Sequence, residues 1–192
     1  MTTPLSQKPH SRGAPFSLAN KLERVAFHAV WLAVARFTPP SLHRWRRFVL
    51  RAFGARIGAG VRIHGSARVW LPRNLEIGPG ALIGPGVRLY NQGAVAIGAD
   101  SVISQRAHIC ASSHRIDDPG FELALRPVSI GAGCWVAAEA FVGPGVTMGD
   151  GAVLAARGAL FGDAAPMGVY RGNPAVRIGT RELSGRELPG AS

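Results

Sequence analysis

Residues 130–160 read IGAGCWVAAEAFVGPGVTMGDGAVLAARGAL, and an apolar residue recurs in this stretch at every sixth position. The recurring residues are Ile130, Val136, Val142, Met148, Leu154 and Leu160. Neither a helix, with a period of about 3.6 residues, nor a strand, with a period of about 2, places apolar residues at this spacing. A six-residue period is typical of a parallel β-helix, in which three hexapeptides form one triangular coil.

The same period extends through most of the chain. Counting upstream finds nine further turns, which open at Ile57, Ile63, Val69, Ile77, Ile83, Leu89, Ile97, Ile103 and Ile109. The fifteen turns predict an all-β solenoid over 57–165, a parallel β-helix of about five coils near 57–74, 77–94, 97–114, 130–147 and 148–165. We expect each opening residue to fill the lumen. The residue four positions later is Ser, Ala or Val in eleven of the fifteen turns, Ser113 among them, and should also point inward.

One segment interrupts the repeat. Residues 115–129, RIDDPGFELALRPVS, leave the period between the third and fourth coils, directly after Ser112-Ser113-His114. A long excursion from a rigid scaffold commonly carries function, so we expect an extruded functional loop here. Asp117 and Asp118 lie in it, and Asp118 also begins an Asp-Pro-Gly turn sequence, so a functional role and an ordinary turn role are both open.

The positive charge is unevenly distributed. The 192-residue chain has a net charge of +11, and residues 1–56 hold ten Lys or Arg against a single acid. Apolar periodicity predicts two amphipathic helices within 17–56. In the second, Trp and Phe share one face, and Arg44, Arg47 and Arg51 line another. That pattern fits a helix in an anionic membrane interface, and it equally fits one packed on the solenoid or on a neighbouring subunit. Nucleic acid is not expected, because no binding motif is present.

Composition excludes several classes of protein. Hydrophobic residues make up 47% and charged residues 17%, which indicates a folded chain. Two cysteines, Cys110 and Cys134, cannot form a disulfide framework. No apolar run reaches about 18 residues, and the N-terminus has no signal-peptide core. We therefore expect a cytoplasmic protein, peripheral to the inner face of the plasma membrane if the basic helices bind lipid, with disordered ends at 1–16 and 184–192.

The interrupted repeat resembles a known family. The hexapeptides, the loop opened by a His, the stretch 130–160 and the later RGNPAVRIG look like the left-handed β-helix acyltransferases. SVISQRAHICASSHRIDDPGF and AEAFVGPGVTMG, with the two N-terminal helices, are most similar to the colanic-acid-biosynthesis-type O-acetyltransferases, relatives of the galactoside, maltose and nodulation acetyltransferases. The resemblance covers roughly residues 16–180.

The resemblance implies transfer of an acetyl group from acetyl-CoA to a sugar hydroxyl in exopolysaccharide or cell-envelope polysaccharide biosynthesis. It implies His114 as the general base, a task that suits imidazole because its ordinary pKa is about 6.5. Transfer would be direct, so neither Cys110 nor Ser113 needs to act as a nucleophile. The acceptor saccharide could be lipid-linked, and the basic helices would then keep the enzyme near it. Asn91, Asp117 and Asp118 are the candidate acceptor contacts.

The resemblance also implies a homotrimer with active sites between adjacent β-helices. The candidate acetyl-CoA contacts are Trp135, Ala138, Ala156, Arg157, Gly172, Asn173 and Arg177, and segment 166–183 would hold the adenosine and phosphate end. Trp135 could equally be a packed surface aromatic and Arg177 a solvated side chain. Two features depart from the family pattern: Phe161-Gly162 replaces a common Thr-Lys, and Arg157 replaces a common Gly.

Two alternative functions share this fold. The γ-class carbonic anhydrases bind zinc through three His between subunits, but His108 and His114 are six residues apart and should lie on different faces of one coil. We therefore expect no metal. The other alternative is a non-catalytic trimeric scaffold held at a membrane by its basic helices, which would bind no CoA.

Overall fold

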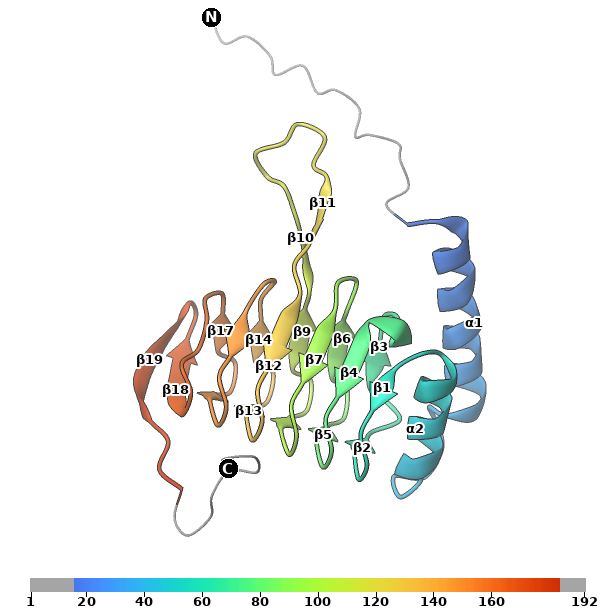
Figure 1. Ribbon diagram of the computed structural model, residues 1–192, viewed down its shortest axis with the longest axis horizontal. Coiled ribbons are helices and arrows are strands. Elements are labelled where there is room, and N and C mark those ends of the chain that lie inside the picture. Colours follow the sequence, from blue (N-terminus) through green and yellow to red (C-terminus); the bar gives the residue numbers. More distant parts are fainter. Residues whose placement is uncertain (1–15, 184–192) are drawn as a thin grey trace, which may run out of the picture.

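The computed structural model describes residues 16–183, which form one solenoid with two helices at one end (Figure 1). The segments 1–15 and 184–192, within the predicted disordered ends, lie outside the described residues. The solenoid is a parallel β-helix with three stacks of short strands, so the predicted fold is confirmed. We call the three stacks faces I, II and III, in the order in which the chain visits them.

Each face takes one strand from every complete coil. Face I consists of β1 (Arg56–Ile57), β4 (Leu75–Ile77), β7 (Val95–Ile97), β12 (Val128–Ile130) and β15 (Thr147–Met148). Face II consists of β2 (Arg62–Ile63), β5 (Leu82–Ile83), β8 (Val102–Ile103), β13 (Trp135–Val136), β16 (Val153–Leu154), β18 (Gly168–Gly172) and β19 (Ala175–Thr180). Face III consists of β3 (Arg68–Val69), β6 (Arg88–Tyr90), β9 (His108–Cys110), β14 (Phe141–Val142) and β17 (Ala159–Leu160).

The predicted lumen residues form the core. All fifteen opening residues are buried, and Ile63, Ile83 and Ile103 stack in register along face II. Because each coil is covered only by its neighbours, this column of aliphatic volume holds the coils together. One predicted inward residue is misplaced: Ser113 is exposed, because the chain has already left the coil at Ser112.

A sixth, partial coil follows the five that the period predicts. Ala164 bridges Met148 on face I, and β18 pairs in parallel with β16 on face II. The chain then reverses, and β19 pairs antiparallel with β18. This hairpin ends the solenoid, so segment 166–183 continues the fold as well as carrying candidate cofactor residues.

Two helices cover the opposite end of the solenoid. Helix α1 (Leu18–Val34) begins after Ser17, whose hydroxyl accepts a hydrogen bond from the backbone N–H of Asn20 at 3.2 Å. Helix α2 (His43–Ala52) packs on β1 and β2. Both helices were predicted within 17–56, and both lie there.

The helices supply hydrogen bonds that the first coil lacks. In the second coil, the carbonyl oxygens of Ile77 and Ile83 accept N–H groups from the coil before. The first coil has no coil before it, so its equivalent carbonyls need other donors. Four of these carbonyls belong to Ile57, Val61, Ile63 and Val69.

Side chains of α1 and α2 are those donors. Arg51 Nε donates to Ile57 at 3.0 Å, Arg47 to Val61 at 2.7 Å, Arg46 to Ile63 at 3.0 Å, and the His28 ring to Val69 at 3.0 Å. Of the two roles left open for the basic second helix, packing on the solenoid therefore describes Arg47 and Arg51. Arg44, which is exposed, is the one residue of the predicted basic face that makes no such bond within the described residues.

Candidate active site

The interruption forms a two-stranded hairpin that projects from the corner between faces III and I (Figure 1). Its strands are β10 (Ser112–His114) and β11 (Leu123–Leu125), paired antiparallel with His114 opposite Leu123. The hairpin starts at Ser112 and β12 resumes the solenoid at Val128, so it is longer at its N-terminal side than the predicted 115–129. The pairing gives His114 a fixed backbone on an otherwise extended loop.

His114 is oriented by Phe121. Its Nδ1 lies 2.8 Å from the Phe121 carbonyl oxygen, and the two rings stack with centroids 4.9 Å apart at 13°. A carbonyl oxygen only accepts, so Nδ1 carries the proton in this bond. In the neutral imidazole the other nitrogen, Nε2, then has its lone pair free. The side chain is exposed, so Nε2 can accept a proton from a bound substrate.

The two predicted aspartates lie at the tip of the same hairpin. Asp118 accepts a hydrogen bond from the backbone N–H of Gly120 at 2.8 Å, which is a turn role. Asp117 is exposed and makes no side-chain hydrogen bond within residues 16–183. The tip therefore offers one free carboxylate beside one that stabilises the turn.

Asn91 is not placed to contact an acceptor. Its side chain is completely buried. Oδ1 accepts the backbone N–H groups of Trp70 and Leu71 at 2.9 and 3.3 Å, and Nδ2 donates to the Leu71 carbonyl at 2.6 Å. The amide thus hydrogen-bonds backbone groups at the turn between faces III and I, where strand pairing ends. The prediction that the Asn91 side chain contacts the acceptor is therefore wrong.

Three predicted cofactor residues form a column at the corner between faces II and III. Val136, Leu154 and Tyr170 pair in register across β13, β16 and β18. Ala138, Ala156 and Gly172 each follow two residues later, so they occupy the same corner in successive coils. Two small side chains and a glycine leave this edge open for an extended ligand.

Trp135 and Arg157 flank this corner. Trp135 points outward from β13, 46% exposed, with its indole N–H donating to the Ser104 hydroxyl at 3.0 Å. Arg157 donates to Glu139 at 2.8 Å, and Arg106 pairs with the same carboxylate at 2.7 Å. The Arg157 hydrogen bond and the Arg106 charge hold the pKa of Glu139 below its usual range. Arg157 is therefore paired within the chain, although its side chain is exposed.

Asn173 and Arg177 lie at the end of the solenoid. Asn173 is exposed in the turn between β18 and β19, next to Gly172. Arg177 lies on β19 and donates to the Thr180 hydroxyl at 3.0 Å. Asn173 therefore continues the corner column beyond the last complete coil, whereas Arg177 lies opposite Tyr170 on face II.

The candidate base and the candidate cofactor residues lie at different corners of the triangular solenoid. His114 projects where face III meets face I, and the alanine column lies where face II meets face III. The strands of face III separate them along the chain's own surface. A single chain therefore presents the candidate base and the candidate cofactor edge separately.

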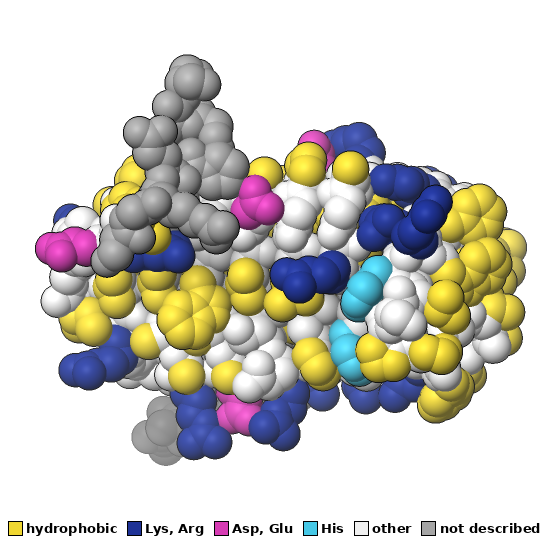
Figure 2. All heavy atoms as spheres, turned by 90° about the horizontal axis from the view of Figure 1, so that it is seen from below, with side chains coloured by type: hydrophobic (Ala, Val, Ile, Leu, Met, Phe, Trp, Pro, Cys, Tyr) yellow, Lys and Arg dark blue, Asp and Glu magenta, His cyan; other side chains and the backbone are white. Residues whose placement is uncertain are grey.

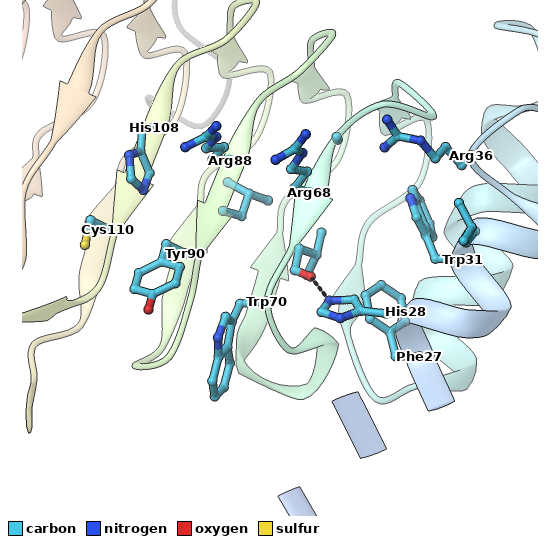
Figure 3. Close-up of a pocket in the computed structure, with 14 residues that line it drawn as sticks. Phe27, His28, Trp31, Arg36, Arg68, Trp70, Arg88, Tyr90, His108 and Cys110 are labelled. Atoms are coloured by element: carbon cyan, nitrogen blue, oxygen red, sulfur yellow. Dashed lines mark hydrogen bonds between the residues drawn. The ribbon is translucent and has the colours of Figure 1, made fainter. Parts of the chain in front are cut away.

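A pocket on face III was not predicted from the sequence (Figure 3). It has a volume of about 800 Å³ and lies between α1 and the outward side chains of β3, β6 and β9. Arg36, Arg68 and Arg88 line it together with Trp70 and Tyr90. The available signal was the outward position just before the opening residue, which is Arg in two successive coils of this face.

Two further observations bear on the alternatives. Within residues 16–183, no group of three His, Cys, Asp or Glu side chains is arranged to hold a metal ion. In the same part of the chain, neither helix is both long and apolar enough to cross a bilayer.

The chain combines a hexapeptide-repeat parallel β-helix with a histidine-bearing hairpin and a corner of small residues. It belongs to the hexapeptide-repeat acetyltransferases. It is 42% identical over 166 residues to the Escherichia coli K12 protein named "Putative colanic acid biosynthesis acetyltransferase WcaF". The alignment covers 86% of this chain and 91% of that protein. No family model matches the chain. The predicted family and enzyme class are confirmed.

Solved structures share the fold. A hexapeptide-repeat acetyltransferase from Vibrio cholerae, solved with acetyl-CoA, has a TM-score of 0.79 at 19% identity, over 87% of this chain and 91% of that one. A maltose O-acetyltransferase from Clostridium difficile 630 has a TM-score of 0.74 at 22% identity, over 87% and 90%. At these identities the likeness concerns the fold.

Proposed function

We propose that this acetyltransferase transfers an acetyl group from acetyl-CoA to a hydroxyl of a saccharide in exopolysaccharide or cell-envelope polysaccharide biosynthesis. The relative at 42% identity is named for colanic acid biosynthesis, and structures of the same fold include a complex with acetyl-CoA and a maltose O-acetyltransferase. The observation that carries the proposal is the His114 to Phe121 contact at 2.8 Å, which leaves Nε2 as a proton acceptor on an exposed hairpin.

His114 acts as general base in direct transfer. The acceptor oxygen attacks the thioester carbonyl carbon while its proton passes to Nε2 of His114. The tetrahedral intermediate then expels the CoA sulfur, which takes the proton from the imidazolium, and the products are an acetyl ester and free CoA thiol. Hydrogen bonding to Phe121 favours the required tautomer, and Asp117 at the hairpin tip is available to an acceptor hydroxyl. No covalent acyl-enzyme forms.

The active site lies between two subunits of a homotrimer. His114 and the alanine column occupy different corners of one chain, so a complete site needs the hairpin of one subunit beside the column of its neighbour. The pantetheine arm follows Trp135, Ala138 and Ala156. The adenosine and phosphate end lies near Gly172 and Asn173, where Arg177 supplies positive charge.

Arg157 has a smaller part in this proposal than the resemblance implies. Its guanidinium already pairs with Glu139, and a phosphate would have to compete with that carboxylate. We therefore propose that the Arg157 side chain does not bind the cofactor phosphates. Only its backbone, at the corner next to Ala156, lies beside the cofactor.

A titration of acetyl-CoA into the purified protein tests the donor without knowledge of the acceptor. A ligand that binds only the folded state increases the free energy of unfolding, by about 2.7 kcal/mol at a ligand concentration of one hundred times Kd. The melting temperature rises as a result. We expect a saturable rise, followed by release of free thiol when hexoses or their diphosphate-linked forms are added. Absence of both would favour a non-catalytic scaffold, and bound zinc in the same sample would favour a metalloenzyme.

Peripheral membrane contact is a separate proposal. Figure 2 shows apolar side chains gathered at the helical end of the molecule, where Leu18, Phe37 and Phe48 are 71%, 80% and 60% exposed. These side chains, with the exposed Arg44, suit an anionic bilayer surface. Flotation with anionic vesicles tests this, and protein that stays in the soluble fraction would contradict it.

A further inference from the structure

The face III pocket combines an apolar lining with a cationic edge. Phe27, Trp31 and Leu32 of α1 supply apolar side chains, and Trp70 and Tyr90 have ring centroids 6.5 Å apart in an edge-on arrangement. Figure 3 shows the guanidinium groups along one side of the pocket and these two rings along the other. A ligand that fits both sides has an anionic part and a part that packs on aromatic rings.

The cationic edge is a ladder of like charges. Arg68 on β3 lies in register with Arg88 on β6, and Arg88 with His108 on β9. Arg36, which follows α1, lines the same pocket. Like charges directly opposite each other in neighbouring strands are destabilising. The fold by itself therefore gains nothing from placing these arginines together.

Nothing within the described chain neutralises this ladder. Among residues 16–183, the pocket lining contains no Asp or Glu, and neither Arg68 nor Arg88 forms an ion pair. Face I shows the contrast: at the matching outward positions of the same two coils, Arg56 is opposite Glu76 and pairs with it at 2.6 Å. Face I thus has an acidic partner for its outward arginine, whereas the outward arginines of face III have none among the described residues.

His108 extends the same edge. Its Nε2 is buried and has no hydrogen-bond partner within the described residues. Burial, and then the Arg88 guanidinium, lower the pKa of His108, so the ring is mainly neutral near pH 7. A neutral imidazole beside two arginines can still donate one hydrogen bond to an anionic oxygen.

We propose that this pocket binds the diphosphate of a glycosyl diphosphate, so that the acceptor sugar reaches the enzyme attached to a nucleotide or a polyprenyl carrier. The proposal rests on the proposed function and specifies its acceptor class. Guanidinium groups bind phosphate oxygens with paired, charge-assisted hydrogen bonds, and a diphosphate supplies enough oxygens for several of them. Tyr90, which is 40% exposed, provides a surface on which the attached group packs, whereas Arg24 already lies over the Trp70 ring, 4.2 Å from its centroid. Cys110 ends the pocket, and His114 is four residues further along the chain, so a sugar extending past Cys110 approaches the hairpin.

Calorimetric titration in the presence of saturating CoA tests this, because the cofactor edge is then already filled. The three probes are inorganic pyrophosphate, UDP and farnesyl diphosphate. The test variant is Arg68→Gln with Arg88→Gln. The control, Arg44→Gln with Arg56→Gln, removes the same charge from exposed positions outside the pocket.

We expect pyrophosphate to bind the wild type and the control, and to bind the test variant at least tenfold more weakly. We also expect the test variant to melt no lower than the wild type, because a repulsion has been removed. Tighter binding of UDP identifies a nucleotide carrier, and tighter binding of farnesyl diphosphate identifies a polyprenyl carrier.

Equal binding by wild type and test variant, or no binding by any probe, would overturn the proposal. So would a test variant that melts lower, because the arginines would then have a structural role. Acetyl-CoA binding is measured on the same samples. If acetyl-CoA binds and the diphosphates do not, only the acceptor class is wrong, and the transferase proposal stands.

Discussion

The guanidinium of Arg46 on α2 donates a hydrogen bond of 3.0 Å to the carbonyl oxygen of Ile63 on β2. Arg46 is completely buried, and it also donates to the carbonyls of Thr38 at 2.8 Å and Pro40 at 3.0 Å. Burial lowers the pKa of Arg46, but the group stays charged in the neutral range. One side chain thus ties the turn between the helices to the open end of the solenoid.

Replacing Arg46 by alanine should destabilise the protein by about 3–5 kcal/mol, because several buried carbonyls lose their donor at once. Urea unfolding monitored by circular dichroism measures the change. Arg44→Ala is the matched control, since Arg44 is an exposed neighbour on the same helix, and it should change stability by no more than about 0.5 kcal/mol. Equal effects from the two variants would show that the first coil does not depend on this donor.

Replacing His114 by alanine should lower kcat by about 10²–10⁴, because the hydroxyl then attacks without a base. The affinity for acetyl-CoA should change little, since the proposed contacts to the pantetheine arm come from Trp135, Ala138 and Ala156 and not from His114. Steady-state thiol release and acetyl-CoA titration together measure both quantities. Ser113→Ala, which alters the exposed neighbour on the same strand, should retain the wild-type rate. A His114→Ala variant that keeps full activity would remove this residue from the mechanism.

Ala156→Trp should weaken acetyl-CoA binding at least tenfold by filling the corner between faces II and III, with little effect on stability because the site is exposed. Ala59→Trp, at the exposed corner between faces I and II, is the control and should bind normally. Equilibrium titration with acetyl-CoA distinguishes them. Equal affinities would move the cofactor away from this column.

A mixture of the two impaired variants, His114→Ala and Ala156→Trp, tests whether subunits share the site. After unfolding and refolding together, a His114→Ala chain can offer its intact column to the His114 of an Ala156→Trp chain. Random trimers then regain about one site in four. With acetyl-CoA below saturation, each variant refolded alone should keep only its own reduced rate. A mixture without activity, from variants that both form trimers, would place the whole site within one chain.

Stability should fall above about pH 9 through the Cys134 thiol. Cys134 is 1% exposed, and burial raises its pKa to about 11. The unfolded chain releases this proton first, so the contribution is complete below about pH 9 and is lost as the pH rises towards 11, to a total of about 3 kcal/mol. Urea midpoints near pH 8 and pH 10.5 should fall further apart in the wild type than in Cys134→Ala. Parallel behaviour of the two proteins would contradict the assignment.

The six-residue period was enough to predict the coils and the point of interruption. Each coil contacts only its neighbours, so one-dimensional spacing translates directly into stacking. Ile130, Val136 and Val142 therefore lie in the lumen where the count places them. The same count was wrong for Ser113. The chain leaves the coil at Ser112, before the six-residue period is interrupted in the sequence.

The candidate site was predictable in part. The resemblance supplied the candidate cofactor contacts, and the strand register brings Ala138, Ala156 and Gly172 together at one corner, because positions two residues past paired strands stack. The role of Asn91 was not predictable: its amide bonds backbone groups twenty residues away, and a local pattern does not distinguish a buried amide from an exposed one. The face III pocket was missed because one of its walls is α1, far away in the sequence.

The sequence alone determined the solenoid, its two helices and the extruded segment that follows His114, since all of these depend on local periodicity and its interruption. Only the tertiary structure decided what the basic side chains do. Arg46, Arg47 and Arg51 turn towards the open carbonyls of the first coil, whereas Arg68 and Arg88 line a pocket without a counter-charge. Charge is visible in a sequence, but the direction of a long side chain depends on which unpaired groups the fold brings within its reach.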